Sequence, residues 1–149
     1  MKTSMKIVLI TVPLAILAFL ASPVGPLGSF WRPAAELPMP SGAKLALFLI
    51  PLIAEAVAFG LGISFLFFGY PQVKAFAPVS KGASRAAHLA LSWLLLNWWP
   101  HDSLHLFIGE SMNGLLALEY GFHFTIIVSG LILIAYFLAA LRTQQKALA

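Results

Sequence analysis

The stretch AKLALFLIPLIAEAVAFGLGISFLFF, residues 43–68, decides the fold class of this chain. It contains two charged side chains, Lys44 near its start and Glu55 near its middle. About 20 consecutive apolar residues are enough for a helix to cross the hydrocarbon core of a bilayer. The sequence therefore predicts a transmembrane helix over residues 43–69, with Pro71 as its stop signal.

Three further apolar segments flank this helix and are also long enough to be predicted as spans or near-spans. They cover residues 6–22, 85–99 and 113–141. The first segment could instead be a signal peptide, but cleavage after Ala21 or Ser22 would leave a large residue at the −3 position, which favours an uncleaved helix. Pro100 is expected to end the third span.

The composition agrees with a membrane protein and excludes several other classes. Of the 149 residues, 60% are hydrophobic and 9% are charged, against about 25% charged in a typical soluble domain. There is no cysteine, which excludes disulfides and thiolate metal sites. We expect one transmembrane domain over residues 1–149, an all-α four-helix bundle, with the lipid bilayer as its surroundings and no nucleic acid as a partner.

The positive charges predict the orientation of the bundle. With the N-terminus in the cytoplasm, seven of the nine Lys and Arg residues lie on the cytoplasmic side. Only Arg32 and Lys44 then lie outside. The expected topology has both termini inside, in a plasma membrane such as the bacterial inner membrane, and it places the loop after Trp99 on the outer (periplasmic) face.

Residues 97–123 hold three of the four histidines and three of the five acidic residues. His123 lies 19 residues before Arg142, about 28 Å along a helix, and His101 lies 16 residues after Arg85, about 24 Å. Both histidines should therefore reach the outer boundary of the hydrocarbon.

Two local patterns bring the polar side chains of this region together. Asp102 and Ser103 can cap a short interfacial helix over residues 104–108, between the third and fourth spans. Glu119 and His123 are four residues apart and share one face of the last helix.

Imidazole and carboxylate side chains at one depth on adjacent segments are typical of a transition-metal site, with zinc, copper or iron as the candidates. The predicted ligands are His101, His105, His123 and Glu119, with Asp102 orienting a histidine and Glu55 as an additional ligand. The alternative is structural: such residues often bond to one another and to helix ends.

Three functions remain open at this point. The chain could bind a metal for catalysis or for delivery to a partner. It could be an accessory subunit that packs on other membrane proteins of a redox or pigment complex, or on a second copy of itself. It could also be a transport subunit in which Glu55 relays a proton or ion.

His88 is far from the cluster and is expected to be a packing residue. Its use as a haem ligand is the less favoured alternative.

No motif assigns a catalytic residue, so the sequence leaves open whether the protein is an enzyme. It contains neither a G-x-S-x-G elbow nor a Gly-rich phosphate loop. The spacing HDSLH, residues 101–105, resembles the H-x-x-x-H box of membrane desaturases and hydroxylases. The H-x-x-H-H boxes of those enzymes are absent, and their activity is not carried over.

Overall fold

The structure is a computed structural model that describes residues 3–23, 25–28, 40–108 and 116–148. All regular elements within these ranges are helices, five in number, and no strand occurs there. They are α1 (Thr3–Ala21), α2 (Ala43–Phe68), α3 (Tyr70–Phe76), α4 (Lys81–Ile108) and α5 (Leu116–Leu148).

The prediction of an all-α chain is confirmed, and the first two spans agree closely with α1 and α2. The last helix, α5, has 33 residues and continues past Arg142 to Leu148, because nothing between these residues breaks a helix. The first residues of the predicted fourth span, 113–115, lie outside the described residues.

The short helix α3 was missed by the sequence analysis. Pro71 was interpreted as a stop signal, but it is the second residue of α3. A proline in the first turn of a helix is well tolerated, because the N–H that it lacks would have no partner inside the helix. Pro71 therefore marks the start of α3 after the end of α2.

The prediction that a helix ends at Pro100 and is followed by a separate short helix is wrong. α4 is one helix of 28 residues with Pro100 inside it. Proline removes a backbone hydrogen bond inside a helix, and membrane helices accept this where neighbouring helices support the chain. α4 has such neighbours, since it packs on α2, α3 and α5.

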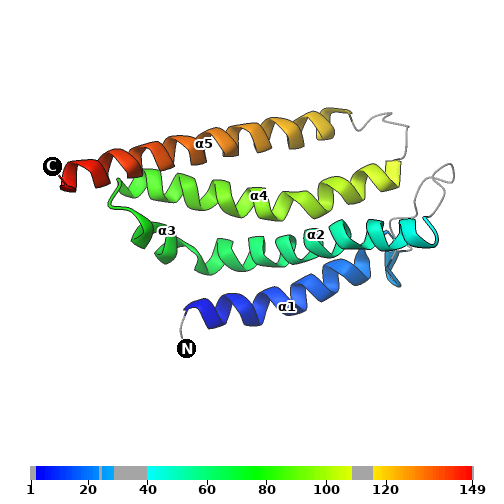
Figure 1. Cartoon of the computed structure of the whole chain (residues 1–149). Helices are drawn as coiled ribbons and strands as arrows, with labels where there is room; N and C mark the ends of the chain where they lie inside the picture. The colour runs from blue at the N-terminus through cyan, green and yellow to red at the C-terminus, as the bar shows by residue number, and fades with distance from the viewer. Residues whose placement is uncertain (1–2, 24, 29–39, 109–115, 149) are drawn as a thin grey trace.

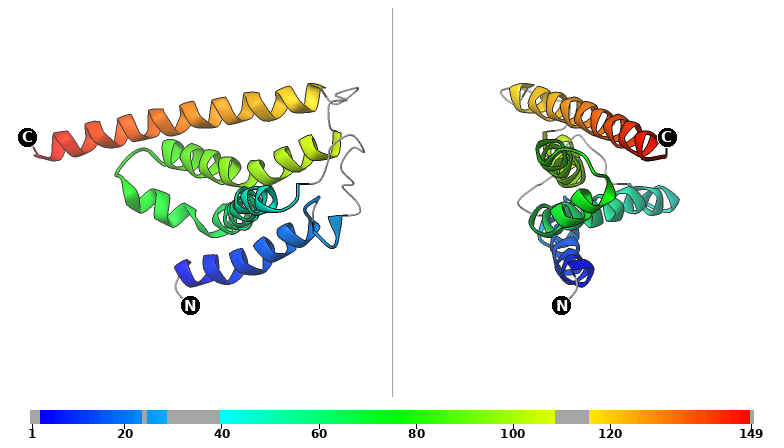
Figure 2. Two further views of the ribbon diagram at one scale, coloured as in Figure 1. Left: turned by 45° about the vertical axis from the view of Figure 1, so that its right-hand side comes forward. Right: turned by 90° about the vertical axis from the view of Figure 1, so that its left-hand side faces the viewer.

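The four long helices lie side by side in the order α1, α2, α4, α5, and successive helices run in opposite directions (Figure 1). Extensive contacts join α1 to α2, α2 to α4, and α4 to α5. Two further views show the same order (Figure 2). The predicted four-helix bundle is not confirmed, since these contacts describe a row of helices rather than a ring around one core.

Among the residues that the structure describes, three helices are long and apolar enough to cross a membrane, namely α1, α2 and the Leu116–Lys146 part of α5. α4 has 28 residues but carries more polar side chains than these three helices, so the predicted third span, residues 85–99, is not confirmed as a membrane span. The helices place large apolar side chains on the outside, including Leu47, Phe67, Phe124 and Ile127. This distribution indicates a bilayer environment.

Small and polar residues fill the interfaces between the helices. The polar residues with almost no exposed surface in the described ranges are Asn97 and five serines: Ser22, Ser64, Ser84, Ser92 and Ser103. Thr11 of α1 hydrogen bonds to Ser64 of α2 at 2.7 Å, and Trp93 of α4 donates to Thr125 of α5 at 2.9 Å. Between helices in lipid, close packing of small residues and such hydrogen bonds replace the hydrophobic effect as the source of stability.

Two glycines of α2 permit the closest approaches. A Cβ atom on Gly60 would lie 2.6 Å from the carbonyl oxygen of Thr11 in α1. A Cβ atom on Gly62 would lie 2.6 Å from the backbone nitrogen of Leu96 in α4. Because these neighbours are backbone atoms, they cannot rotate away, and any larger residue would force the helices apart.

We expect Gly62→Ala to destabilise the protein by about 1–3 kcal/mol, the usual cost of overpacking a close interface. The measurement is the free energy of unfolding in detergent, obtained by titration with a denaturing detergent. Gly130→Ala in α5 is the matched control, because a Cβ atom there meets nothing within 4 Å. Equal stability of the two variants would contradict the close contact between α2 and α4.

Candidate metal centre

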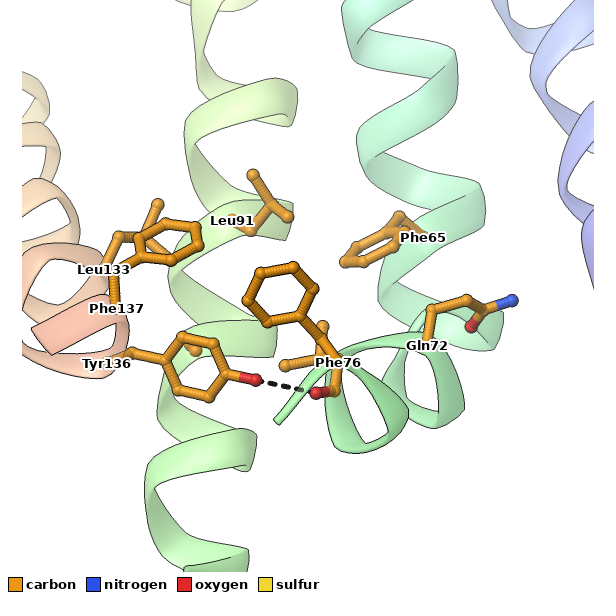
Figure 3. A pocket seen from close by; sticks show the side chains of 9 residues that line it. Phe65, Gln72, Phe76, Leu91, Leu133, Tyr136 and Phe137 are labelled. Atoms are coloured by element: carbon orange, nitrogen blue, oxygen red, sulfur yellow. Dashed lines mark hydrogen bonds between the residues drawn. The ribbon is translucent and has the colours of Figure 1, made fainter. Parts of the chain in front are cut away.

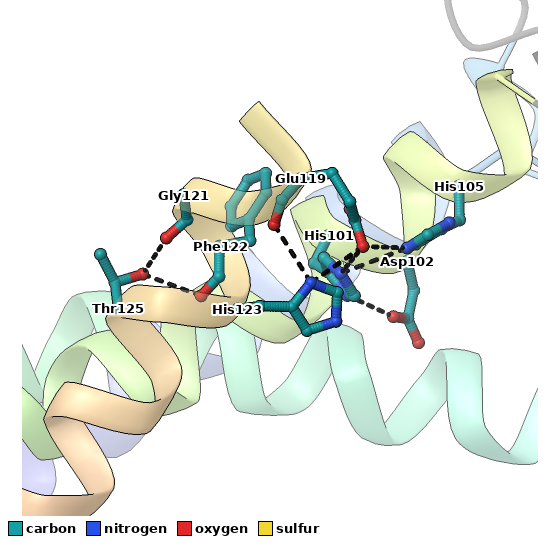
Figure 4. Close-up of polar contacts among 8 residues, drawn as sticks. All are labelled: His101, Asp102, His105, Glu119, Gly121, Phe122, His123 and Thr125. Carbon is teal, nitrogen blue, oxygen red and sulfur yellow. Dashed lines mark hydrogen bonds and ion pairs between the residues drawn. The ribbon is translucent and has the colours of Figure 1, made fainter. Parts of the chain in front are cut away.

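The predicted polar cluster lies where the C-terminal part of α4 faces the N-terminal part of α5 (Figure 4). Because α4 continues through Pro100, His101 and His105 are separated by one helical turn and share a face. Glu119 and His123 do the same on α5. The continuous helix holds the two α4 histidines more firmly than the separate short helix that was expected.

One carboxylate oxygen is the meeting point of three imidazole rings. Glu119 Oε1 lies 3.0 Å from His105 Nε2, 3.0 Å from His123 Nδ1 and 3.3 Å from His101 Nε2. The two α4 histidines are also close, with their Nε2 atoms 3.2 Å apart. All four side chains that were predicted as metal ligands are therefore brought together.

Burial differs across the cluster. The Glu119 side chain is 7% exposed and that of His101 is 14% exposed, whereas the His123 side chain is 55% exposed. The second carboxylate oxygen, Glu119 Oε2, is buried and has no hydrogen-bond partner among the described residues. A buried carboxylate needs hydrogen-bond donors or a cation to compensate its charge. The imidazole rings around Glu119 contact Oε1 and leave Oε2 without a partner among the described residues.

Asp102 fixes the orientation of the His101 ring. Asp102 Oδ1 lies 3.0 Å from His101 Nδ1. A carboxylate can only accept, so the hydrogen on Nδ1 of His101 is donated to Asp102. In the neutral ring, Nε2 then carries the lone pair, and it faces Glu119 and His105. This carboxylate–imidazole pairing is the usual support of a metal-binding histidine.

A lone pair that faces a carboxylate oxygen at 3.3 Å is unfavourable unless a cation lies between the two atoms. Either a proton on His101 Nε2 or a metal ion can supply this positive charge. Ligand atoms held at about 2.0–2.1 Å around tetrahedral zinc lie roughly 3.3 Å apart. The separations in the cluster, 3.0–3.3 Å, are close to this value.

One ligand atom from each of His101, Glu119 and His123 lies within 4.8 Å of the other two, so this group could hold a metal ion. His123 can contribute Nδ1 only when its hydrogen is on Nε2, because a protonated Nδ1 has no lone pair and donates instead to the carbonyl oxygen of Glu119, 3.1 Å away. The exposure of His123 allows Nε2 to donate to water. His105 joins this group through its contacts with His101 and Glu119.

Glu55 lies on α2 and faces the interior of the helix row rather than lipid. It is 6% exposed, and its carboxyl group lies near that of Asp102. Glu55, Asp102 and His105 line one cavity of about 330 Å³ together with apolar residues of α2. Glu55 therefore lies beside Asp102, and it is not one of the residues that meet at Glu119.

One residue of the surroundings was missed. The ring of Phe122 packs edge-on against His101, with centroids 5.4 Å apart. In the sequence Phe122 directly precedes the predicted ligand His123, and this adjacency could have indicated that its ring packs against one of the histidine rings.

His88 is separate from the cluster. It is buried where α2 meets α3 and α4, and its Nε2 lies 2.9 Å from the carbonyl oxygen of Phe65. The rings of Phe65 and Tyr70 pack against it. These contacts agree with the packing role that the sequence suggested.

No protein-family model, curated protein or solved structure matches this chain. The case for a function therefore depends on the geometry of the cluster.

The interaction between His101 and Glu119 can be measured by a double-mutant cycle. We expect His101→Ala and Glu119→Ala to be non-additive by about 1–3 kcal/mol in the free energy of unfolding, because each residue is the buried partner of the other. The cycle is run with a chelator present, so that bound metal does not contribute. The pair His101→Ala and Thr143→Ala is the control and should be additive. Additivity of both pairs would show that the contact does not form.

Proposed function

We propose that this chain is a small integral membrane protein that binds one divalent transition-metal ion through His101, Glu119 and His123, with His105 as a fourth ligand. The observation that carries the proposal is the convergence of three imidazole nitrogens on Glu119 Oε1, at 3.0–3.3 Å, from two different helices. The ion serves catalysis or delivery to a partner protein.

The nature of the ligands narrows the choice of metal. Three imidazoles and one carboxylate, without thiolates, suit zinc, copper or iron better than calcium or magnesium, which prefer oxygen ligands. No Lys or Arg forms an ion pair with these acids in the described ranges. A divalent cation would therefore supply the positive charge that the cluster lacks.

The exposure of the cluster supports a site that exchanges its ion with the outside. His123 and His105 are partly exposed, at 55% and 38% of their side chains, while Glu119 is buried beneath them. A structural metal site is usually closed, whereas a catalytic or delivery site keeps one side accessible. The partly open arrangement favours catalysis or delivery over a purely structural ion.

The site would lie on the outer side of the membrane, with all four long helices crossing it and both termini inside. Lys6 of α1 lies 5.7 Å from the ring centroid of Phe68, at the end of α2. This contact joins the N-terminus to the end of the molecule that carries Lys74, Lys81 and Arg85. Positive residues favour the cytoplasmic side, which leaves the cluster at the opposite end outside.

The protein purified without chelators should contain about one zinc, copper or iron ion per chain, measured by elemental analysis. We expect His101→Ala and Glu119→Gln to remove this metal, and Asp102→Asn to weaken its binding by roughly 10–100-fold through loss of the oriented ring. His88→Gln is the control: it also removes a histidine, and its amide can still donate to the Phe65 carbonyl.

A wild-type protein that contains no metal, and that binds none at micromolar concentration, would contradict the proposal. The cluster would then be a structural network. The hypothesis of an accessory subunit, tested by stoichiometric co-purification of other membrane proteins, would take its place.

The topology can be tested separately, because the chain has no native cysteine. We expect cysteines placed at Leu116, at the start of α5, and at Gln145, near its end, to react with a membrane-impermeant reagent from opposite sides. Both positions are exposed. Labelling of both positions from the same side would contradict the outer location of the cluster.

A further inference from the structure

The end of the molecule opposite the metal centre has a recess that neither the metal proposal nor the helix packing explains. It has a volume of about 210 Å³ and lies over α4, between α2 and α3 on one side and α5 on the other (Figure 3). Its walls are apolar and largely aromatic, with Phe65, Phe76, Leu91, Tyr136 and Phe137 among the lining residues.

A buried hydrogen bond ties the wall formed by α3 to α5, in addition to the packing of α3 on α4 and α2. Tyr136 OH of α5 donates to the carbonyl oxygen of Val73 in α3 at 2.7 Å (Figure 3). Val73 and Tyr136 are 8% and 5% exposed. This bond connects the short helix to the long one, so that the recess between them has fixed walls.

The recess opens toward the outside of the helix row. Phe76 and Phe137 are 57% and 48% exposed, and their rings meet edge-on with centroids 5.7 Å apart. In a bilayer these two side chains face lipid. A water molecule has a share of liquid volume of about 30 Å³, so the recess has room for several methylene groups of a lipid chain.

Two of the helices that form the recess, α3 and α4, carry basic residues at this end of the molecule. Lys74 lies on α3 between residues that line the recess, and Lys81 and Arg85 lie in the first turns of α4. All three are exposed, and none forms an ion pair within the described part of the chain. The sequence contains no Asp or Glu from residue 56 to residue 101.

We propose that this recess binds an anionic phospholipid, with one acyl chain in the recess against Phe76 and Phe137 and the headgroup on Lys74, Lys81 and Arg85. On the topology proposed above, this end of the molecule lies on the cytoplasmic side, where basic residues beside a recess between membrane helices suit anionic headgroups. The largely apolar walls suit the acyl chain, and Gln72 is a polar residue among those that line the recess. The site is independent of the metal centre, which lies at the other end of α4.

The test is native mass spectrometry of the full chain in detergent, with phosphatidylglycerol and phosphatidylcholine of identical acyl chains as probes. We expect phosphatidylglycerol to bind at least about tenfold more tightly, because only its headgroup carries a net negative charge. Lys74→Gln should reduce this preference, whereas Lys44→Gln, which removes an exposed lysine at the opposite end of α2, should leave it unchanged.

The contribution of the acyl chain is tested by filling the recess. We expect Leu91→Trp, at a lining position, to reduce phosphatidylglycerol binding by about tenfold. Leu89→Trp is the matched control, because Leu89 is 56% exposed and does not line this recess. If Leu91→Trp does not fold, glycerol 3-phosphate is added to the unchanged protein as a headgroup without chains, and it should not bind.

Equal binding of the two lipids would overturn the proposal. Equal effects of Leu91→Trp and Leu89→Trp, or binding of glycerol 3-phosphate as tight as that of phosphatidylglycerol, would also overturn it. Either of these last results would show that the basic residues attract anions at the surface and that the recess has no part.

Discussion

The close contact of α2 with helices on both of its sides is the constraint on which the rest of the structure depends. Gly60 brings the backbone of α1 against α2, and Gly62 brings the backbone of α4 against it. In lipid, apolar side chains gain little by leaving one apolar environment for another, so close backbone approach and interhelical hydrogen bonds must hold the helices together. The position of α4, and with it the metal centre, follows from the contact at Gly62.

The row of helices gives the molecule two chemically different ends. One end carries Lys6, Lys74 and Arg85 with no neighbouring acid in the sequence. The other carries Glu119 with three imidazole rings around one of its oxygens. Because the helices are antiparallel and similar in length, residues far apart in the chain gather at the same end. This separation of charge is the basis of both the metal proposal and the lipid proposal.

The continuity of α4 through Pro100 determines how the metal centre is built. A break at this proline would have left His101 and His105 on a separate segment. The helix instead keeps them one turn apart and directs both toward α5. Asp102 holds the His101 ring by a hydrogen bond, and Glu55 of α2 lies beside Asp102.

The sequence by itself determined the helical class, the apolar spans and the residues of the cluster, because hydrophobic length and i, i+4 spacing are local properties. It did not determine that α4 passes through Pro100 or that Pro71 begins a helix, since the tolerance of a proline depends on the helices packed around it. Only the tertiary structure decided that the helices form a row, that three rings meet one oxygen of Glu119, and that Glu55 reaches Asp102. Those outcomes depend on distances between segments far apart in the chain, and a local pattern does not contain them.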